Sequence, residues 1–296
     1  MNLKYKILWI ENEKDWVESI EDQLQEYLED YGFIYERKLI TKEENDINYN
    51  DFDLILMDLN LAEQPNGAEL ISRIRDLGVF TNVVFYSASG LDILRAKGKE
   101  KELEGVFYSG RTPDAEFVRR VKAVIDSTIK KVQDLNNLRG LVMAEVSELD
   151  AMMDIIIPPY FNTEERMVLF HKHITTNRET TLQKALSCDN KCQLVWRGKS
   201  IQEIISKLDS SQKARTLKII IEQSRPDLYQ EGNFFDDYNN DIIIPRNDLA
   251  HCKSEIRDGK EILLTRKGDK CFDDNFFKRI RQDILKYSNI FKELLR

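Results

Sequence analysis

Short apolar runs alternate with longer amphipathic stretches along the first 126 residues. Five short segments are candidate strands: Lys4–Ile10, Phe33–Leu39, Phe52–Met57, Asn82–Tyr86 and Gly105–Tyr108. Phe52–Met57 is a near-continuous apolar run, which is typical of a strand that is buried in a parallel sheet. We therefore expect these five segments to be β-strands.

Helical patterns connect several of these runs. The first pattern places a set of apolar side chains on one helix face: Trp16, Val17, Ile20, Leu24, Tyr27 and Leu28. A turn at Pro65-Asn66-Gly67 precedes a second helix over Ala68–Leu77, and Thr112-Pro113-Asp114 opens another, with proline near its first turn. Strands that alternate with helices predict a doubly wound, parallel, five-stranded sheet, in which functional groups gather beyond the carboxyl ends of the strands.

The polar residues that follow the predicted strands are candidate functional groups. They are Glu11, Asn12, Asp58, Ser87 and Ser109. Three features resemble the receiver domain of two-component response regulators: the acidic segment after the first strand, the sequence LILMDLNL…PNGAELI around the third, and the small hydroxyl residue after the fourth. The resemblance covers residues 1–126.

This resemblance implies a flavodoxin-like fold and a phosphoryl-accepting site. In that family the residue in the position of Asp58 receives the phosphoryl group, with a histidine kinase as the partner. Glu11 and Asn12 would then hold Mg²⁺ together with Asp58, and Ser87 and Ser109 would line the phosphoryl pocket. A carboxylate that attacks phosphorus needs a hard cation to neutralise the crowded negative charge.

Two departures from the family pattern bear on this function. Asn12 stands where the family has a second acidic residue, and an amide in place of a carboxylate weakens Mg²⁺ binding. The lysine that follows the fifth strand in the family has no counterpart, because Ser109 aligns with it and Arg111 comes two residues later. Two hypotheses stay open: Asp58 is phosphorylated, or the unit is a pseudo-receiver that serves protein contacts, with Asp58 a solvated loop carboxylate.

From Ala115 the helical period continues without proline until Pro158. We interpret residues 127–150 as a stiff connecting segment, either one long helix or two helices joined near Asp134–Gly140. Residues 151–296 then form a second domain. It is predicted to be a helical bundle with helices over Thr163–Asn177, Ile201–Leu208, Lys213–Gln223, about Pro245–Glu255, and Asp273–Leu295. A small β-hairpin, Glu261–Arg266 with Lys270–Phe272, interrupts it. The fold class is therefore α/β followed by all-α.

Composition and charge limit the functions that the chain can serve. The 296 residues are 42% hydrophobic and 32% charged with four cysteines, and no apolar run approaches the length of a membrane span. We therefore expect a cytoplasmic protein without membrane association. Residues 1–126 carry 16 Lys and Arg against 26 Asp and Glu, a net charge of −10, whereas residues 127–296 carry +2. This balance disfavours extended binding to duplex DNA but permits a small RNA-binding site in the second half.

Residues 245–253 contain the motif on which the predicted activity depends. They read Pro-Arg-Asn-Asp-Leu-Ala-His-Cys-Lys, with four residues between Arg246 and His251. This motif, late in an all-helical domain, resembles the signature of HEPN domains, in which such a pair forms an RNA-cleaving site. The resemblance covers residues 140–296 and implies a homodimer in which two motifs face one cleft. It also implies a role in toxin-like or defence systems.

The residue types suit metal-independent RNA cleavage. His251 can transfer protons near neutral pH, and the planar guanidinium of Arg246 can bind phosphate oxygens. Asn247 can orient the imidazole or the ribose. We therefore expect a receiver-regulated endoribonuclease, with catalytic residues Arg246, Asn247 and His251 and without a cofactor at that site. The alternative is a non-enzymatic signalling adaptor whose helical half binds a protein or a nucleotide, with His251 a structural residue.

Overall fold

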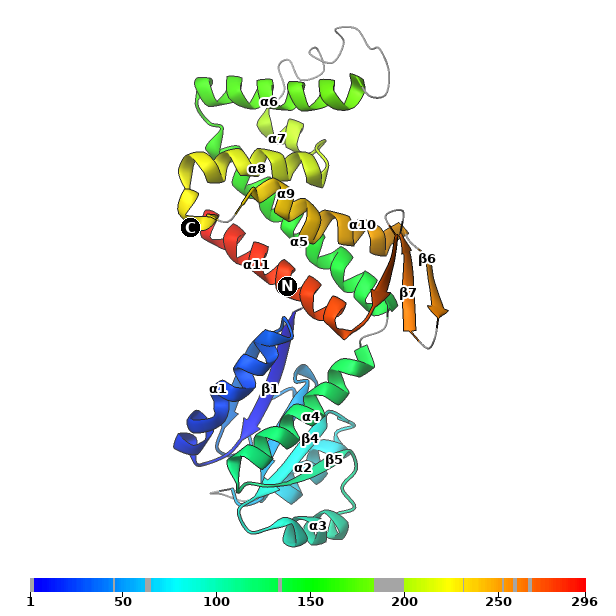
Figure 1. Cartoon of the computed structure of the whole chain (residues 1–296). Helices are drawn as coiled ribbons and strands as arrows, with labels where there is room; N and C mark the ends of the chain where they lie inside the picture. Colours follow the sequence, from blue (N-terminus) through cyan, green and yellow to red (C-terminus); the bar gives the residue numbers. More distant parts are fainter. Residues whose placement is uncertain are drawn as a thin grey trace. The chain divides into compact units, whose positions relative to one another are not determined.

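The computed structural model describes the chain in nine stretches: residues 3–44, 46–61, 65–132, 135–183, 200–230, 232–251, 253–257, 260–265 and 268–296. They form two compact units that divide between Leu138 and Arg139 (Figure 1). This division falls within the first turns of α5 (Leu135–Tyr160), and the helix before it is α4 (Asp114–Val132). The segment 127–150 thus contributes residues to both units.

The first unit is built on a five-stranded parallel sheet. Its strands are β1 (Lys4–Ile10), β2 (Ile34–Ile40), β3 (Leu54–Asp58), β4 (Asn82–Ser87) and β5 (Val106–Gly110). They lie in the order β2-β1-β3-β4-β5, and every neighbouring pair is parallel. This is the flavodoxin-like strand order that response-regulator receiver domains share, and it confirms the predicted fold class of this half.

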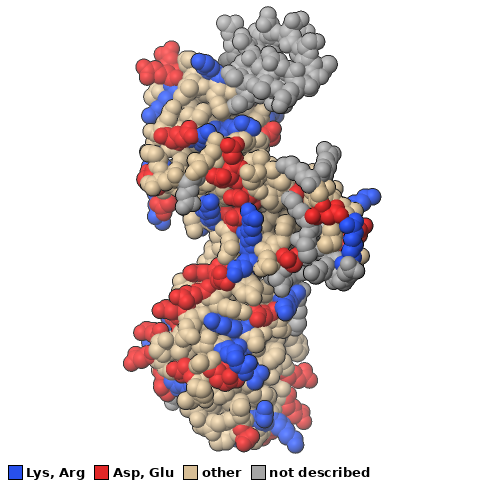
Figure 2. All heavy atoms as spheres, in the orientation of Figure 1, with Lys and Arg blue, Asp and Glu red and all other residues tan. Residues whose placement is uncertain are grey.

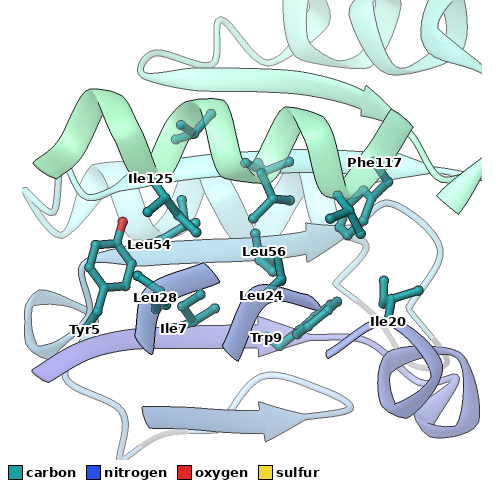
Figure 3. Close-up of a cluster of buried hydrophobic side chains, with 14 of the residues drawn as sticks. Tyr5, Ile7, Trp9, Ile20, Leu24, Leu28, Leu54, Leu56, Phe117 and Ile125 are labelled. Atoms are coloured by element: carbon teal, nitrogen blue, oxygen red, sulfur yellow. The ribbon is translucent and has the colours of Figure 1, made fainter. Parts of the chain in front are cut away.

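Helices cover both faces of this sheet. They are α1 (Lys14–Asp30), α2 (Gly67–Asp76), α3 (Leu91–Glu100) and α4, and a short 3₁₀ turn, η1 (Tyr49–Asp51), precedes β3. Side chains of α1 and α4 pack on one face against Ile7, Trp9 and Leu56 (Figure 3). The neighbouring residues Leu8 and Ile55 point to the opposite face and pack with α2 and α3. Burial on both faces explains why β3, whose five residues are all buried, carries four apolar residues in succession.

The second unit is mainly helical, as predicted. Besides α5 it contains α6 (Glu164–Gln183), α7 (Ile201–Ile205), α8 (Ser210–Ser224), a 3₁₀ turn η2 (Pro226–Leu228), α9 (Phe234–Tyr238), a π-helical turn η3 (Asn239–Ile243), α10 (Ile244–His251) and α11 (Asp274–Leu294). The elements α9, η3 and α10 follow one another without interruption. Aromatic rings of α9 and α11 form much of the core: Phe234, Tyr238, Tyr287 and Phe291.

A small antiparallel sheet replaces the simple hairpin that the sequence predicts. Its strands are β6 (Lys253–Arg257), β7 (Lys260–Thr265) and β8 (Gly268–Phe272), in that order. The helix predicted to run to Glu255 ends at His251, and the following residues form β6 instead. The side chain of Ile256 is 78% exposed, so this strand buries no regular apolar face that a sequence pattern could reveal.

No helix in the described part of the chain is both long enough and apolar enough to cross a membrane.

Candidate functional site

Four of the polar residues singled out in the first half lie at the carboxyl edge of the parallel sheet. Ile10 pairs with Met57, so the residues that follow them, Glu11 and Asp58, lie side by side. Asp58 pairs with Tyr86, and Tyr86 pairs with Ser109. Glu11, Asp58, Ser87 and Ser109 are all buried, whereas Asn12 is exposed.

Glu11 is fully buried, and both of its carboxylate oxygens have partners. The backbone N–H of Glu13 donates to Oε1 at 2.9 Å, and the hydroxyl of Tyr86 donates to Oε2 at 3.0 Å. The Tyr86 hydroxyl itself accepts a 2.8 Å hydrogen bond from Nε1 of Trp9. These bonds replace the water that a buried carboxylate loses.

Arg111 brings a positive charge to this edge of the sheet. Its guanidinium donates two parallel hydrogen bonds to the carboxylate of Glu13, at 2.8 and 2.7 Å. It lies 3.8 Å from Oε2 of Glu11 and 4.1 Å from the centre of the Trp16 ring. Its backbone N–H donates to the carbonyl of Ser87. The Arg111 hydrogen bonds lower the pKa of Glu13.

Asp58 ends β3 with its side chain enclosed. Burial, and then the negative charge of Glu11, raises its pKa from 3.8 to about 6. The backbone N–H of Asn60, which donates to Oδ2 at 3.0 Å, and the charge of Arg111 oppose this rise. Asp58 is therefore not the solvated loop carboxylate of the pseudo-receiver hypothesis. It is a buried acid beside another acid.

Asn60 links Asp58 to Ser87, a role that the sequence analysis missed. Its side-chain amide donates to Oγ of Ser87 at 3.2 Å, and that Oγ also accepts from the backbone N–H of Ser89 at 3.0 Å. Ser109 behaves differently, because its hydroxyl donates to the carbonyl of the adjacent Gly110. The edge thus joins Asp58, Asn60 and Ser87 into one hydrogen-bonded group.

Gly67 allows α2 to begin directly beside Asp58. A Cβ atom at this position would lie 2.0 Å from the Asp58 carbonyl oxygen, and the Gly67 N–H donates to the carbonyl of Leu59. The side chain of Asn66 caps the helix by accepting from the N–H of Glu69. Asn66 and Gly67 therefore fix the start of α2 beside Asp58.

The first unit does not offer a ready magnesium site. Mg²⁺ requires oxygen ligands at about 2.0–2.1 Å in near-octahedral geometry. Both oxygens of Glu11 already accept hydrogen bonds, the amide of Asn12 is exposed, and Arg111 is the cation beside the acids. Within the described residues, no three His, Cys, Asp or Glu side chains are grouped so that they could hold a metal. The ligand set implied by the receiver resemblance does not fit Mg²⁺ in this arrangement.

The three motif residues of the second unit lie on α10. Arg246 is half-buried, and its Nη1 donates to Oδ1 of the exposed Asn247 at 3.1 Å. Its Nε is buried and has no hydrogen-bond partner within the part of the chain that the structure describes. His251 is exposed in the last turn of the helix.

A buried polar cluster surrounds the base of the Arg246 side chain. The pKa of Asp150 on α5 is raised by burial, and the charge of Arg246 is among the groups that oppose this rise. The Ser210 hydroxyl donates to Asp150 at 2.6 Å. The hydroxyl of Tyr238 is also buried, and Arg139 ties α5 to α10 by donating to the Leu249 carbonyl at 2.7 Å. This cluster anchors the helix that carries the motif.

A π-helical turn sets the orientation of α10. The N–H of Ile244 donates to the carbonyl of Asn239, five residues earlier, and Pro245 has no N–H to donate. Such turns are frequent at functional sites. In the regular helix that follows, Arg246 and His251 are about 7.5 Å apart along the axis and differ by about 140° around it. One chain therefore presents a single exposed motif imidazole at some distance from its arginine.

The chain is similar to solved structures of receiver domains. No protein-family model matches the chain, and no curated protein matches it. The non-phosphorylated HemR receiver domain from Leptospira biflexa is 24% identical, with 41% of this chain and 94% of that chain covered and a TM-score of 0.34. The BeF₃-activated receiver domain of DrrB from Thermotoga maritima is 19% identical, with 43% and 98% covered and a TM-score of 0.34. The phosphorylated cyanobacterial phytochrome response regulator RcpA is 18% identical, with 43% and 96% covered and a TM-score of 0.33. Because these identities and TM-scores are low, the evidence for the fold of the first unit is its own strand order, β2-β1-β3-β4-β5.

The raised pKa of Asp58 predicts a pH-dependent gain in stability for Asp58→Asn. A buried acid whose pKa is raised in the folded state costs stability once it ionises, so the penalty is full above pH 6 and disappears below about pH 4. Asp58→Asn should stabilise the first unit by on the order of 2 kcal/mol at high pH and by little at low pH. Urea unfolding followed by tryptophan fluorescence measures this difference. The exposed Asp76→Asn is the matched control, and a destabilised Asp58→Asn at pH 8 would contradict the prediction.

Gly67→Ala should destabilise the first unit, because the new methyl group must displace the backbone of Asp58. We expect a loss of about 2 kcal/mol or more, in the range of overpacked sites. Gly140→Ala is the control, since a Cβ there meets no atom within 4 Å and alanine favours the helix. Thermal unfolding of the two variants should shift in opposite directions, and an unchanged midpoint for Gly67→Ala would refute the close approach.

Proposed function

We propose that this chain is a signalling protein in which the receiver-fold unit is the regulatory input and the second unit is a metal-independent, HEPN-type endoribonuclease. The enzyme works as a homodimer on RNA. The observation that carries this proposal is the placement of Arg246 and His251 on one short helix, with the arginine anchored and the histidine exposed.

The environment of Arg246 suits phosphate binding. Its Nε is held in the protein interior, while Nη1 lies beside the exposed Asn247. An anchored guanidinium loses little conformational freedom when it binds, and its planar fork matches two phosphate oxygens. Asn247 holds the guanidinium from the solvent side. In this proposal Arg246 stabilises the charge that develops on the phosphorane, and Asn247 positions it.

The proposed reaction uses two histidines. One His251 takes the proton of the ribose 2′-hydroxyl, whose oxygen then forms a bond to phosphorus. The bond from phosphorus to the 5′ oxygen breaks, and the His251 of a second copy donates a proton to that oxygen. The products are a 2′,3′-cyclic phosphate and a 5′-hydroxyl end. Because each chain supplies one motif imidazole, the reaction requires two copies.

The charge distribution supports a small RNA site better than a long nucleic-acid groove. The first 126 residues carry a net charge of −10, which repels phosphate, and the rest of the chain carries +2. On the face drawn in Figure 2, the Lys and Arg atoms of the described residues are interspersed with Asp and Glu. We therefore propose that RNA approaches the second unit alone, and that extended duplex DNA is not a substrate.

We place the regulatory input at the Asp58 edge of the first unit. The group formed by Asp58, Asn60 and Ser87 connects the ends of β3 and β4 by hydrogen bonds. A protein partner that binds this edge, or a phosphoryl group from a histidine kinase with Arg111 as the compensating cation, would change the arrangement of this edge. In this proposal that change alters how two copies bring their motifs together.

His251→Ala should abolish RNA cleavage, because it removes the group that transfers protons. The purified full-length protein is incubated with end-labelled structured RNA in EDTA, and fragments are resolved on a gel. We expect a loss of about a hundredfold or more in rate for His251→Ala, and a comparable loss for Arg246→Ala. Fragment ends should carry the cyclic phosphate.

His171→Ala is the matched control, since it removes a histidine that lies on α6 away from the motif. Its cleavage rate should equal that of the unaltered protein. RNA binding, measured by fluorescence anisotropy, gives a second result that does not depend on an activating signal. If the unaltered protein neither cleaves nor binds RNA, the ribonuclease proposal is wrong and the second unit is a binding module for another partner.

A further inference from the structure

We infer that the charge of the acidic edge of the first unit is partly compensated from within: Arg111 supplies positive charge where a divalent cation would supply it, and the unit binds Mg²⁺ only once that charge is removed. This inference concerns the first unit and does not depend on the ribonuclease proposal.

The buried carboxylates create a need for positive charge. Glu11 is fully buried, and Asp58, beside it, is 3% exposed. Two ionised acids that lie side by side away from water are unstable unless a cation compensates them. Within the described residues, the one ion pair that Glu11 forms is with Arg111, at 3.8 Å. The pocket therefore already contains one cation, Arg111, beside these acids.

The guanidinium is held in place by several contacts. Glu13 accepts two hydrogen bonds from it, and the Trp16 ring lies against its face. Trp16 is fixed in turn, because its Nε1 donates to Asp114 at 3.0 Å. The Arg111 side chain is only 10% exposed. A group with these contacts is not displaced as readily as a solvated surface arginine.

The carboxylate oxygens that could coordinate Mg²⁺ already accept hydrogen bonds from the protein. The oxygens of Glu11 accept hydrogen bonds from the Glu13 N–H and from the hydroxyl of Tyr86. Oδ2 of Asp58 accepts from the N–H of Asn60. A magnesium ion would have to break several of these bonds and lie close to a fixed positive charge, which raises its energy further. Asn12, which stands where receiver domains have a second acidic residue, supplies no negative charge that would attract the ion.

The test is a magnesium titration of the full-length protein. Trp16 contacts Arg111, and Trp9 is linked through Tyr86 to Glu11, so tryptophan fluorescence reports on the pocket directly. MgCl₂ is added at constant ionic strength, and the thermal unfolding midpoint is recorded in parallel. We expect no saturable change for the unaltered protein. We expect a saturable change for Arg111→Gln, which EDTA reverses and which raises the unfolding midpoint in proportion to occupancy.

Two controls separate charge from folding. Arg111→Lys keeps the positive charge but not the planar fork, and it should remain insensitive to Mg²⁺. Arg119→Gln removes an exposed arginine that pairs with Glu116 on the surface of α4, and it should also remain insensitive. Glutamine at position 111 can still donate to Glu13, so Arg111→Gln is less prone to unfold than an alanine variant. If it does unfold without Mg²⁺, recovery of the folded state by Mg²⁺ counts as binding.

Two outcomes would overturn the inference. The first is a saturable magnesium response in the unaltered protein that Asp58→Asn abolishes, because the pocket would then accept the ion beside Arg111. The second is a folded Arg111→Gln that stays insensitive to Mg²⁺, because Arg111 would then not be the group that excludes it. Neither outcome affects the RNA cleavage assay, so failure here and failure of the proposed function are distinguishable.

Discussion

The contact between Arg111 and the acidic residues after β1 joins the first and the last strands of the parallel sheet in sequence order. Arg111 follows β5 and meets Glu11 and Glu13, about one hundred residues earlier. Its ring contact with Trp16 adds α1, and its backbone bond to Ser87 adds the end of β4. Because a fully buried carboxylate needs both hydrogen bonds and a nearby cation, Arg111 helps to hold the ends of β1, β4 and β5 and the start of α1 at the same edge.

The second unit also buries polar groups, in the core between its helices. Asp150, Tyr238 and Arg246 carry polar atoms into the interior of this unit, next to aromatic side chains. Polar groups in such a place restrict the packing to arrangements in which they stay close together. The cluster thus links α5 to the helix that runs from α9 to α10. Arg246 extends from this interior, where its Nε is buried, to the exposed Asn247, to which its Nη1 donates a hydrogen bond.

Much of the first unit could be predicted from sequence, because its central strands β1, β3 and β4 are largely buried and mostly apolar. Leu54–Asp58 is an example, since all five of its residues are buried. The helix α3 was not predicted, because only Leu94 and Gly98 are buried along it and they form no clear apolar stripe. The edge residues Glu11, Asp58 and Ser87 could be predicted from strand topology. The partners of Arg111 could not, because a contact across the sheet leaves no local pattern, and the roles assigned to Arg246, Asn247 and His251 stay predictions.

The π-helical turn at Asn239–Ile243 makes the second unit sensitive to chain length at one point. A π turn holds one residue more than an α turn, so deleting one residue there would restore a regular helix. Every residue from Ile244 onward would then rotate by about 100° relative to Tyr238. Arg246 would leave the polar cluster around Asp150, although no residue of the cluster had changed. In relatives of this chain, we therefore expect substitutions within this turn to be common, and insertions or deletions there to be rare.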